Sequence, residues 1–429
     1  MLDILYLLAL IFASPFLFYQ SLRRGNYREG WGQKFLGLSP NLSPVSAGKK
    51  RIWFHAVSVG EINMLKPIVS HMRVEYPDWE FVVSTTTKTG LEVAKKLFAD
   101  QTSVFYCPFD FSWAVKRALR RIKPDMLVLV ELEIWPNLIK FASKSGAKTA
   151  IVSARMDPPS FKRYRRARLF LASTFRRIDL IVAQDDLAAD YFKRLGVAPE
   201  RVCVAGSLKF DGVKTDKNNS ATQTLAKLVG IRESDVVFLA GSLHHPEEKG
   251  ALEVYRRLRR DYPALKLILV PRHKERFEDV AKMLDASEFP WTRRSAITVP
   301  IDPDSEASRV VLVDVLGELG VWWGLANIAF VGGSWGARTG HNMLEPAGYG
   351  AAVSFGPNTK NFQSIVEALL RENAAKVVAD VDEMEAFVKK CLDDPDYARS
   401  MGSAARELTI RNAGTTMRSL AELARLFDA

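Results

Sequence analysis

A glutamate stands where an apolar run gives way to a helical pattern, in the segment His55–Pro67, which reads HAVSVGEINMLKP. A carboxylate at such a strand-to-helix turn can cap the helix, or it can take part in chemistry. The spacing Ser58-Val59-Gly60-Glu61 is also that of a capping box, in which Ser and Glu satisfy each other's backbone N–H groups. These residues alone leave both roles of Glu61 open.

A second candidate site lies in the glycine-rich stretch Phe330–Gly350, which reads FVGGSWGARTGHNMLEPAGYG. We expect a strand to end at Gly332-Gly333-Ser334 and a helix to begin near His341-Asn342, with Glu345 in its first turn. Glycines let the backbone approach a ligand closely, and free N–H groups at a helix start attract phosphate. Glu345 can accept hydrogen bonds from a ribose diol, or it can simply favour the helix dipole. The turn at residues 241–248, GSLHHPEE, offers similar N–H groups to a ligand.

Other charged residues are less distinctive by themselves. Glu131 in ELEIWPN and Lys209 in GSLKFD each end or follow a predicted strand, and a Glu–Arg ion pair and a solvated lysine are their plain structural alternatives. Acidic D-x-D pairs hold Mg²⁺ in other enzymes, but here they lie away from these strand ends, so we expect no metal site. The pairs are Asp302-Pro303-Asp304, Asp380-Val381-Asp382 and Asp394-Pro395-Asp396.

The elements that must position these residues alternate between short β-rich runs and helical segments from residue 51 onward, which is typical of parallel α/β units. Residues 212–224, GVKTDKNNSATQT, are polar and lack apolar periodicity, so we expect a linker there. Helical stretches at about 382–396 and 397–427 close the chain. The strands expected before the linker are Arg51–Val57, Glu80–Thr85, Thr102–Tyr106, Met126–Val130, Thr149–Ser153, Leu180–Ala183 and Val202–Ala205; those after it are Val236–Ala240, Leu265–Val270, Val310–Val313, Ile328–Val331, Ala352–Phe355 and Val377–Ala379.

Two doubly wound α/β domains follow from this pattern. We expect the first at residues 23–211 and the second at residues 225–429, with the linker at 212–224 between them. Open α/β sheets bind ligands at the carboxyl ends of their strands, so we expect the two domains to face a common cleft.

The composition indicates an anionic partner. With 60 Lys and Arg against 49 Asp and Glu, the formal charge is +11, which favours an acidic membrane surface, a phosphorylated substrate or nucleic acid. The three cysteines, Cys107, Cys203 and Cys391, are too scattered for a disulfide framework or a zinc knuckle, so a reducing compartment fits best.

The first 20 residues, MLDILYLLALIFASPFLFYQ, carry one charged side chain, Asp3, and are long enough to span a hydrocarbon core. Arg23, Arg24 and Arg28 follow. Because the positive charge follows the apolar stretch, we expect an uncleaved membrane anchor at residues 1–22 and not a signal peptide. The positive-inside rule then places the rest of the chain on the cytoplasmic side.

A basic stretch at residues 161–177, FKRYRRARLFLASTFRR, interleaves seven Lys or Arg residues with aromatic and aliphatic ones. Near a membrane anchor, this stretch predicts contact with anionic lipid headgroups or with a phosphorylated lipid. An ordinary solvated helix face is the alternative. No recognised RNA-binding module accompanies the charge, so we do not expect nucleic acid as a partner.

Six ordered motifs, together with the N-terminal anchor and YREGWGQKF, resemble the 3-deoxy-D-manno-octulosonic acid (Kdo) transferases of lipopolysaccharide synthesis. The motifs are HAVSVGE, ELEIWPN, GSLKFD, LVPRH, LGEL and GHNMLEPA, and they run across nearly the whole chain. The resemblance implies a GT-B architecture, with two Rossmann-like domains that bind the acceptor and the donor. It also implies a metal-independent, inverting transfer of Kdo from CMP-Kdo to the 6′-hydroxyl of the lipid A precursor lipid IVA, without a cofactor, at the inner membrane.

The resemblance also implies roles for individual residues. Glu61 falls on the general base, and Glu131 and Lys209 fall on positions that stabilise the transition state. A fixed cation such as Lys209 is most useful where charge develops on the departing phosphate. Arg272 suits the phosphate or the Kdo carboxylate, because its planar fork matches such oxygens. The donor-binding positions are Pro271, Arg272, Gly317, Glu318, Leu319, Asn342, Met343, Leu344 and Glu345, with the backbone of 317–319 at the base and Glu345 at the ribose.

Two positions depart from the family pattern: Thr339 precedes Gly340 where a second glycine is usual, and Asn358 replaces a usual histidine. These departures leave the contacts of the donor loop open. The alternatives are another GT-B enzyme, such as a UDP-sugar lipid glycosyltransferase or a nucleotide-sugar epimerase, and a non-catalytic lipid-binding or RNA-binding protein. Within the first motif, we expect Ser58 to cap its helix and the Glu61 carboxylate to face the cleft.

Overall fold

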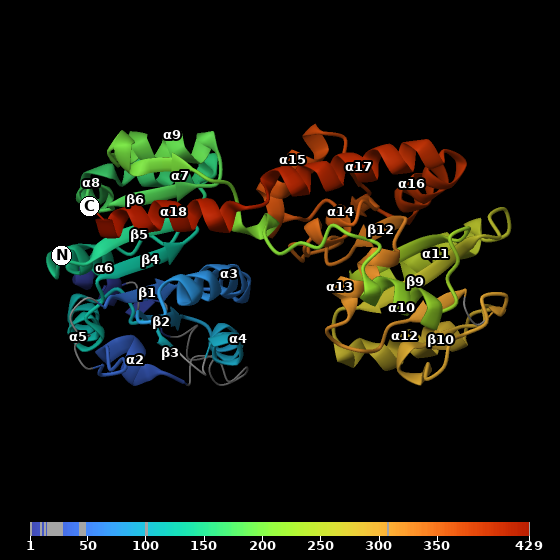
Figure 1. Cartoon of the computed structure of the whole chain (residues 1–429), viewed down its shortest axis with the longest axis horizontal. Coiled ribbons are helices and arrows are strands. Elements are labelled where there is room, and N and C mark those ends of the chain that lie inside the picture. The colour runs from blue at the N-terminus through green and yellow to red at the C-terminus, as the bar shows by residue number, and fades with distance from the viewer. Residues whose placement is uncertain are drawn as a thin grey trace. The chain divides into compact units, whose positions relative to one another are not determined.

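The structure is a computed structural model that describes residues 2–8, 11–12, 14, 29–42, 49–98, 102–306 and 309–428. The chain forms two compact units. Unit 1 comprises Met1–Asp211 and Gly414–Ala429, and unit 2 comprises Gly212–Ala413. Each unit is built on a parallel sheet of seven strands (Figure 1).

The strand order in each sheet reverses once. Unit 1 has the order β3-β2-β1-β4-β5-β6-β7, and unit 2 has the order β10-β11-β9-β8-β12-β13-β14. The reversal falls between β1 and β4 in unit 1 and between β8 and β12 in unit 2. Open α/β sheets bind ligands at the carboxyl ends of the strands beside such a switch point, so these two places are where functional side chains are expected.

Unit 1 has the strands β1 (Arg51–His55), β2 (Glu80–Thr85), β3 (Ser103–Tyr106), β4 (Met126–Val130), β5 (Lys148–Ala154), β6 (Leu180–Ala183) and β7 (Val202–Val204). Its helices are α2 (Trp31–Leu36), α3 (Val59–Glu75), α4 (Lys88–Phe98), α5 (Ser112–Ile122), α6 (Pro136–Lys144), α7 (Pro158–Arg166), α8 (Arg168–Phe175), α9 (Asp186–Leu195) and α18 (Thr415–Asp428).

Unit 2 has the strands β8 (Val236–Leu243), β9 (Leu265–Pro271), β10 (Thr292–Arg293), β11 (Val310–Leu312), β12 (Ile328–Val331), β13 (Ala352–Phe355) and β14 (Ala375–Val377). Its helices are α10 (Ser220–Leu228), α11 (Glu247–Leu258), α12 (Phe277–Asp285), α13 (Leu319–Trp322), α14 (Leu344–Gly348), α15 (Gln363–Arg371), α16 (Val381–Asp393) and α17 (Pro395–Asn412).

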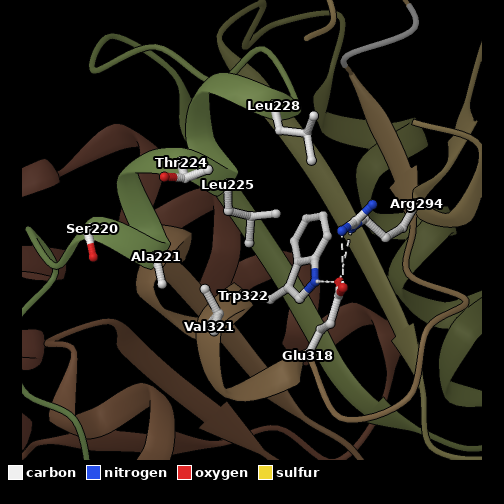
Figure 2. Close-up of a pocket in the computed structure, with 9 residues that line it drawn as sticks. All are labelled: Ser220, Ala221, Thr224, Leu225, Leu228, Arg294, Glu318, Val321 and Trp322. Atoms are coloured by element: carbon white, nitrogen blue, oxygen red, sulfur yellow. Dashed lines mark hydrogen bonds and ion pairs between the residues drawn. The ribbon is translucent and has the colours of Figure 1, made fainter. Parts of the chain in front are cut away.

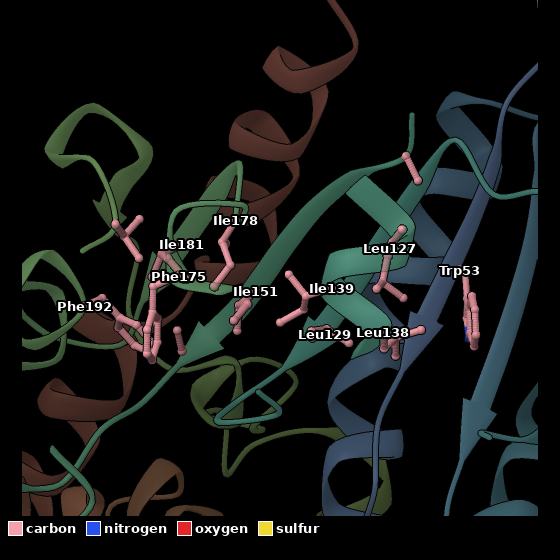
Figure 3. Packing of buried hydrophobic residues seen from close by; sticks show 14 of the residues in the cluster. Trp53, Leu127, Leu129, Leu138, Ile139, Ile151, Phe175, Ile178, Ile181 and Phe192 are labelled. Carbon is pink, nitrogen blue, oxygen red and sulfur yellow. The ribbon is translucent and has the colours of Figure 1, made fainter. Parts of the chain in front are cut away.

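The central strands are apolar on both faces because helices cover both faces of a parallel sheet. Along β1, Trp53 packs into one core cluster with Leu127 and Ile139, as Figure 3 shows. Ile52 and Phe54 point the other way, into a second cluster that includes residues of α3 and α18. Side chains alternate between the faces of a strand, and burial of each large apolar side chain contributes about 1.5–3 kcal/mol. The buried strands therefore form a fixed base for the charged residues at their ends.

The structure corrects the predicted extent of the second domain, which we expected to reach residue 429. Helix α18 belongs to unit 1 and packs against α3, β5 and β6, where its red ribbon lies in Figure 1. Leu420 and Leu423 are buried in the unit 1 core. Asp211 accepts hydrogen bonds from the backbone N–H groups of Gly414 and Thr415 at 2.7 and 3.2 Å, and so holds the start of this helix.

Two further expectations from the sequence differ from the structure. Residues 220–224 of the expected linker form the start of helix α10, and Lys217 Nζ donates to the carbonyl of Ala326 at 2.9 Å, so this segment is packed onto unit 2. The closing helices are three and not two, because Gly414 separates α17 from α18. The break expected between 396 and 397 falls just before Pro395, which begins α17. Pro is suited to the first turn of a helix, and Gly to its end.

The predicted anchor at residues 1–22 lies partly outside the described residues, since 1, 9–10, 13 and 15–28 are not among them. Among the residues that are described, no helix is long and apolar enough to cross a bilayer. Asp3 accepts hydrogen bonds from the Ser112 N–H at 2.8 Å and from Asn137 Nδ2 at 3.2 Å, and the Tyr6 hydroxyl donates to Asp110 at 3.0 Å. The charged residue of the apolar stretch is thus bound to unit 1.

The basic stretch forms α7 and α8, and its aromatic residues have different surroundings. Phe161 and Phe175 are buried in the core, and Phe161 stacks on Tyr191 with ring centroids 4.1 Å apart. Leu169 and Phe170 are 94% and 64% exposed. Part of the apolar pattern that we assigned to a lipid surface therefore serves the core, whereas Leu169 and Phe170, at the start of α8, present apolar atoms to the surroundings.

Candidate active site

Unit 1 gathers charged side chains at the carboxyl edge of its sheet, beside the switch point. Glu61 follows β1, Glu131 follows β4 and Arg155 follows β5. Lys209 lies in η2 (Leu208–Phe210), a short 3-10 helix that follows β7. The three residues predicted to act in catalysis therefore come to one edge of one sheet, together with an arginine that the sequence analysis did not single out.

Glu61 is 9% exposed, and the turn before it holds its carboxylate. Ser58 Oγ accepts a hydrogen bond from the Glu61 N–H at 3.3 Å and donates one to Glu61 Oε1 at 2.8 Å. The Val57 N–H donates to Oε2 at 2.8 Å. Burial raises the pKa of Glu61, and the hydrogen bonds from Val57 and Ser58 oppose that rise.

Capping and catalysis are therefore not alternatives for Glu61. We expected Ser58 alone to serve the cap, but the Glu61 carboxylate takes part in it as well. A carboxylate whose pKa is raised is a stronger base than an ordinary one while it remains ionised near neutral pH. The turn thus fixes the orientation of a group that is suited to accept a proton.

Glu131 binds two cations at once. Lys209 Nζ lies 2.8 Å from Oε1, and Arg155 Nε lies 2.6 Å from Oε2. Burial raises the pKa of Glu131, but the charges and hydrogen bonds of Lys209 and Arg155 together lower it below its ordinary value. Glu131 is therefore ionised at neutral pH, and its main effect is to hold both cations in place.

The backbone around this cluster is adapted to that task. Glu131 has φ 58° and Ser153 has φ 51°, a left-handed conformation that costs free energy for residues other than glycine and is often found at functional sites. Ser153 Oγ accepts a hydrogen bond from the Leu208 N–H at 3.3 Å. Leu208 and Phe210 are both buried, so the side chain of Lys209 between them turns out of the core toward Glu131.

A second acidic residue of ELEIWPN belongs to the cluster, although the sequence analysis did not assign it. Burial raises the pKa of Glu133 to about 7, and the charges of Glu61 and Glu131 add to this rise. The indole N–H of Trp135 donates to Glu133 Oε2 at 2.7 Å and opposes it. The i, i+2 spacing of two glutamates after a buried strand was the available signal for this residue.

In unit 2, a buried carboxylate occupies several N–H groups of the predicted phosphate-binding loops. The carboxylate of Glu247 accepts hydrogen bonds from four backbone N–H groups, those of His244, Gly333, Ser334 and Trp335, at 2.7–3.0 Å. Burial raises the pKa of Glu247 and these hydrogen bonds oppose the rise. A side chain of the chain itself therefore occupies these four N–H groups. The N–H groups expected to attract phosphate at the helix start near His341-Asn342 are not among them.

The residues predicted to bind the donor lie around the carboxyl edge of this sheet. Pro271 ends β9 and Arg272 follows it, exposed and without a carboxylate at ion-pair distance in the described part of the chain. Helix α14 begins at Leu344, two residues later than the predicted start. Asn342 precedes the N-cap residue Met343; its Oδ1 accepts from the Leu344 N–H at 3.1 Å and its Nδ2 donates to Glu345 Oε1 at 3.2 Å.

Met343 and Leu344 are fully buried, so only their backbone can meet a ligand. Burial raises the pKa of Glu345, and the hydrogen bond from Asn342 opposes that rise. A partly buried carboxylate can accept hydrogen bonds from a diol, which is consistent with the role expected for Glu345 at a ribose.

The segment Gly317-Glu318-Leu319 lies beside a pocket of about 360 Å³ in unit 2. Figure 2 shows the Glu318 carboxylate between Arg294, at 3.0 Å, and the indole N–H of Trp322, at 3.2 Å. Gly317 has φ 89°, and a Cβ there would meet nothing within 4 Å. The Glu318 side chain thus holds the turn in place through Arg294 and Trp322, and a ligand can approach the backbone of Gly317.

The D-x-D carboxylates have structural partners. Asp304 pairs with Arg232 at 2.6 Å, and Asp382 pairs with Arg257 at 2.9 Å. Asp380 and Asp394 cap the starts of α16 and α17. In the described ranges, no group of three or more His, Cys, Asp or Glu side chains is arranged to hold a metal ion.

Comparisons with known proteins bear on both units. The family model for 3-deoxy-D-manno-octulosonic-acid transferase (kdotransferase) matches residues 29–212. A curated 3-deoxy-D-manno-octulosonic acid transferase of Haemophilus influenzae is 32% identical over 406 residues, which cover 93% of this chain and 92% of that protein. One of the same description from Chlamydia muridarum is 28% identical, over 96% of this chain and 94% of that protein.

Among solved structures, a putative UDP-N-acetylglucosamine 2-epimerase from Listeria monocytogenes has a TM-score of 0.58 with this chain. It is 14% identical and covers 89% of this chain and 97% of its own. At that identity the likeness concerns the fold, which is GT-B-like. Because the likeness to the Haemophilus protein spans both units at 32% identity, the chain belongs to the 3-deoxy-D-manno-octulosonic acid transferase family of glycosyltransferases.

Proposed function

We propose that this chain transfers Kdo from CMP-Kdo to the 6′-hydroxyl of lipid IVA with inversion at the anomeric carbon. Family membership supports the sugar that is transferred. The observation that carries the mechanism is the cluster at the carboxyl edge of the unit 1 sheet, where the buried Glu61 lies beside a carboxylate that holds two cations.

In the proposed reaction, the acceptor hydroxyl attacks the anomeric carbon of Kdo from the face opposite the phosphate. Its proton passes to Glu61, the bond between that carbon and the phosphate oxygen breaks, and CMP leaves with the electron pair. A positioned general base contributes about 10²–10⁴-fold to such a step. The cap at Val57 and Ser58 orients the carboxylate before the substrate arrives.

Lys209 and Arg155 supply positive charge in this scheme. Both cations share the carboxylate of Glu131, which holds them in place at the strand ends. Fixed charge directed at a group that gains negative charge stabilises the transition state without reorganisation. The transfer requires the donor held by unit 2 to reach this cluster.

We assign donor recognition to unit 2. Arg272 presents a guanidinium group to the phosphate or the Kdo carboxylate, and Glu345 accepts hydrogen bonds from the ribose. The open backbone at Gly317 lies where the cytosine base is expected. Each assignment combines the family resemblance with the position of the residue at the carboxyl edge of the sheet.

We further propose that unit 1 binds the inner membrane from its cytoplasmic side through residues 1–22 and through the first turn of α8. Leu169 and Phe170 are exposed there within a stretch rich in Lys and Arg, a combination that suits an anionic lipid surface. Deletion of residues 1–22 should reduce membrane association. A Leu169→Glu/Phe170→Glu variant should bind anionic vesicles more weakly, whereas Val74→Glu, at an exposed apolar residue of α3, should not.

A donor panel tests the proposed reaction. The protein should consume CMP-Kdo in the presence of lipid IVA, release CMP and give a product of inverted anomeric configuration. Turnover of a UDP-sugar without turnover of CMP-Kdo would favour another GT-B transferase or an epimerase. Salt-dependent RNA binding without any sugar transfer would favour a non-catalytic role.

A further inference from the structure

Two histidines meet at the switch point of the unit 2 sheet. His244 follows β8, and His341 lies in the loop after β12. Their Nε2 atoms are 2.9 Å apart, and their rings stack with centroids 5.2 Å apart at an angle of 14°. Gly333 makes room for them, because a Cβ there would stand 2.6 Å from Cδ2 of His341.

The pair can hold one extra proton and not two. At 2.9 Å one Nε2 atom donates a hydrogen and the other accepts it. One added proton makes the donor ring cationic and strengthens this hydrogen bond. A second would set two N–H groups against each other, so the two imidazoles behave as a single proton-binding group.

The surroundings of the pair are cationic. Burial lowers the pKa of His244 to about 4, and the charges of Arg338, His341, His273 and Arg272 add to this effect. Burial likewise lowers the pKa of His341 to about 4, with contributions from Arg272, His273 and Arg338. Two carboxylates face this region. Glu247 accepts hydrogen bonds from four backbone N–H groups, and Glu345 accepts one from the Asn342 side chain.

The two arginines around the pair lack an anion. Other arginines of unit 2 have a carboxylate at ion-pair distance, such as Arg294 with Glu318 at 3.0 Å. Within the described ranges, neither Arg272 nor Arg338 has a carboxylate at ion-pair distance. Two guanidinium groups without a carboxylate partner, beside a partly buried pair of imidazoles, form a site that suits a ligand with negative charge.

We propose that His244 and His341 form a single proton-holding site for the phosphate of the donor nucleotide, flanked by Arg272 and Arg338, and that phosphate binding loads the pair with its proton. This inference rests on the proposed function for the identity of the nucleotide, and it deepens that function by assigning the group that faces the leaving oxygen.

A phosphate suits the pair better than a carboxylate does. In the donor the phosphate is a diester with one charge, but the CMP that leaves is a monoester. Its second pKa of about 6 is close to the imidazole value of about 6.5, so a proton between them is then nearly balanced. A sugar carboxylate, with a pKa of about 3.5, would leave the proton on the histidine. When the bond from the sugar carbon to the phosphate oxygen breaks, the electron pair stays on that oxygen and the phosphate charge grows from one to two. The loaded proton stabilises this charge or moves to that oxygen, while the hydroxyl proton goes to Glu61.

The test is a pH titration of the histidine signals in full-length protein labelled with ¹³C at the histidine Cε1 position. The chain has six histidines, and His244→Gln and His341→Gln variants assign the signals of the pair. Saturation with CMP should raise the apparent pKa of the pair by more than about one unit, which corresponds to a tenfold change in affinity by linkage. His71, exposed on α3 in unit 1, is the internal control and should not shift.

Cytidine and free Kdo are the matched ligand controls. Cytidine lacks the phosphate and should leave the titration of the pair unchanged. A rise with Kdo but not with CMP would overturn the assignment to the phosphate, and CMP binding without any rise would overturn the proton-holding site while leaving the proposed function intact. If CMP does not bind but UDP binds and raises the pKa of the pair, the site stands and the proposed donor falls.

Discussion

The ammonium group of Lys209 lies 2.8 Å from Oε1 of Glu131, and this ion pair joins the turn after β7 to the end of β4. Arg155 binds the second carboxylate oxygen from the end of β5. Glu131 adopts a left-handed backbone conformation at this point. The family positions assigned to transition-state stabilisation are therefore one structural group, in which the glutamate positions the cations.

Removal of the lysine tests that group. Lys209→Met should lower kcat by about 10²–10³-fold, because it takes away a fixed charge directed at the departing phosphate. Steady-state kinetics with CMP-Kdo measure the effect. Lys193→Met, at an exposed position of α9, is the matched control and should keep normal kinetics. Wild-type kcat in the Lys209 variant would remove the lysine from the mechanism.

The Glu131–Lys209 pair should also show coupling. Glu131→Gln leaves two cations without their anion, so we expect a loss of kcat of at least about 100-fold. Because both residues act through one contact, the double variant should lose much less than the product of the two single losses. A double-mutant cycle on kcat measures this, and strictly multiplicative losses would contradict a shared role.

The acidic limb of the pH–rate profile should report Glu61. Its ionised form is the active one, so activity should fall as the pH drops through its pKa, which burial raises above the ordinary value. In Ser58→Ala, the hydrogen bond that opposes this rise is lost, so the limb should move to higher pH. The variant also loses an N-cap, which costs about 1 kcal/mol of stability.

Ser70→Ala, on the exposed side of the same helix, controls for the general effect of a serine deletion on α3. Its pH profile and its stability should match those of the wild type. If the acidic limb of the pH–rate profile has the same apparent pKa in Ser58→Ala as in the wild type, a group other than Glu61 controls it.

Glu133 should contribute an ionisation near neutral pH. Burial raises its pKa to about 7, and the Trp135 indole donates the hydrogen bond that opposes this rise. Trp135→Phe should therefore shift this ionisation upward, and Glu133→Gln should abolish it. The measurement is the pH dependence of kcat/KM between pH 5 and 9 or so. An unchanged profile in Glu133→Gln would exclude this glutamate from the reaction.

Helix α18 should stabilise unit 1 although it ends the chain. Leu423 is fully buried in the unit 1 core, so Leu423→Ala should lower the free energy of unfolding by about 2–5 kcal/mol. Met417, on the same helix, is 55% exposed, and Met417→Ala should cost much less. Urea unfolding followed by tryptophan fluorescence compares the two variants. Equal effects would argue against docking of α18 on this sheet.

Much of the fold follows from local pattern. The strands Glu80–Thr85, Met126–Val130 and Ile328–Val331 lie within the bounds expected from the sequence, because a buried parallel strand is a short apolar run between polar segments. The periodicity of α18 is equally clear, but a helical pattern does not state which sheet its apolar face meets. The return of this helix to unit 1 depends on tertiary contacts such as Asp211 with Gly414.

The site residues that lie in sequence motifs were predictable, and those that reach the site from a neighbouring strand were not. Glu61, Glu131 and Lys209 come from strand ends that the motifs mark. Arg155 has no motif of its own, and only the adjacency of β4 and β5 brings it to Glu131. Glu247 looks like an ordinary residue of a first helical turn, yet it takes the N–H groups that the glycine-rich loop seemed to offer a phosphate.

The most direct test of the account is mass spectrometry of lipid IVA after incubation with CMP-Kdo and either wild-type or Glu61→Gln protein. The wild type should add the mass of one or more Kdo residues, and the variant, with an unchanged circular dichroism spectrum, should do so at least about 100-fold more slowly. Transfer by Glu61→Gln at the wild-type rate, or no mass gain with the wild type, would contradict the account.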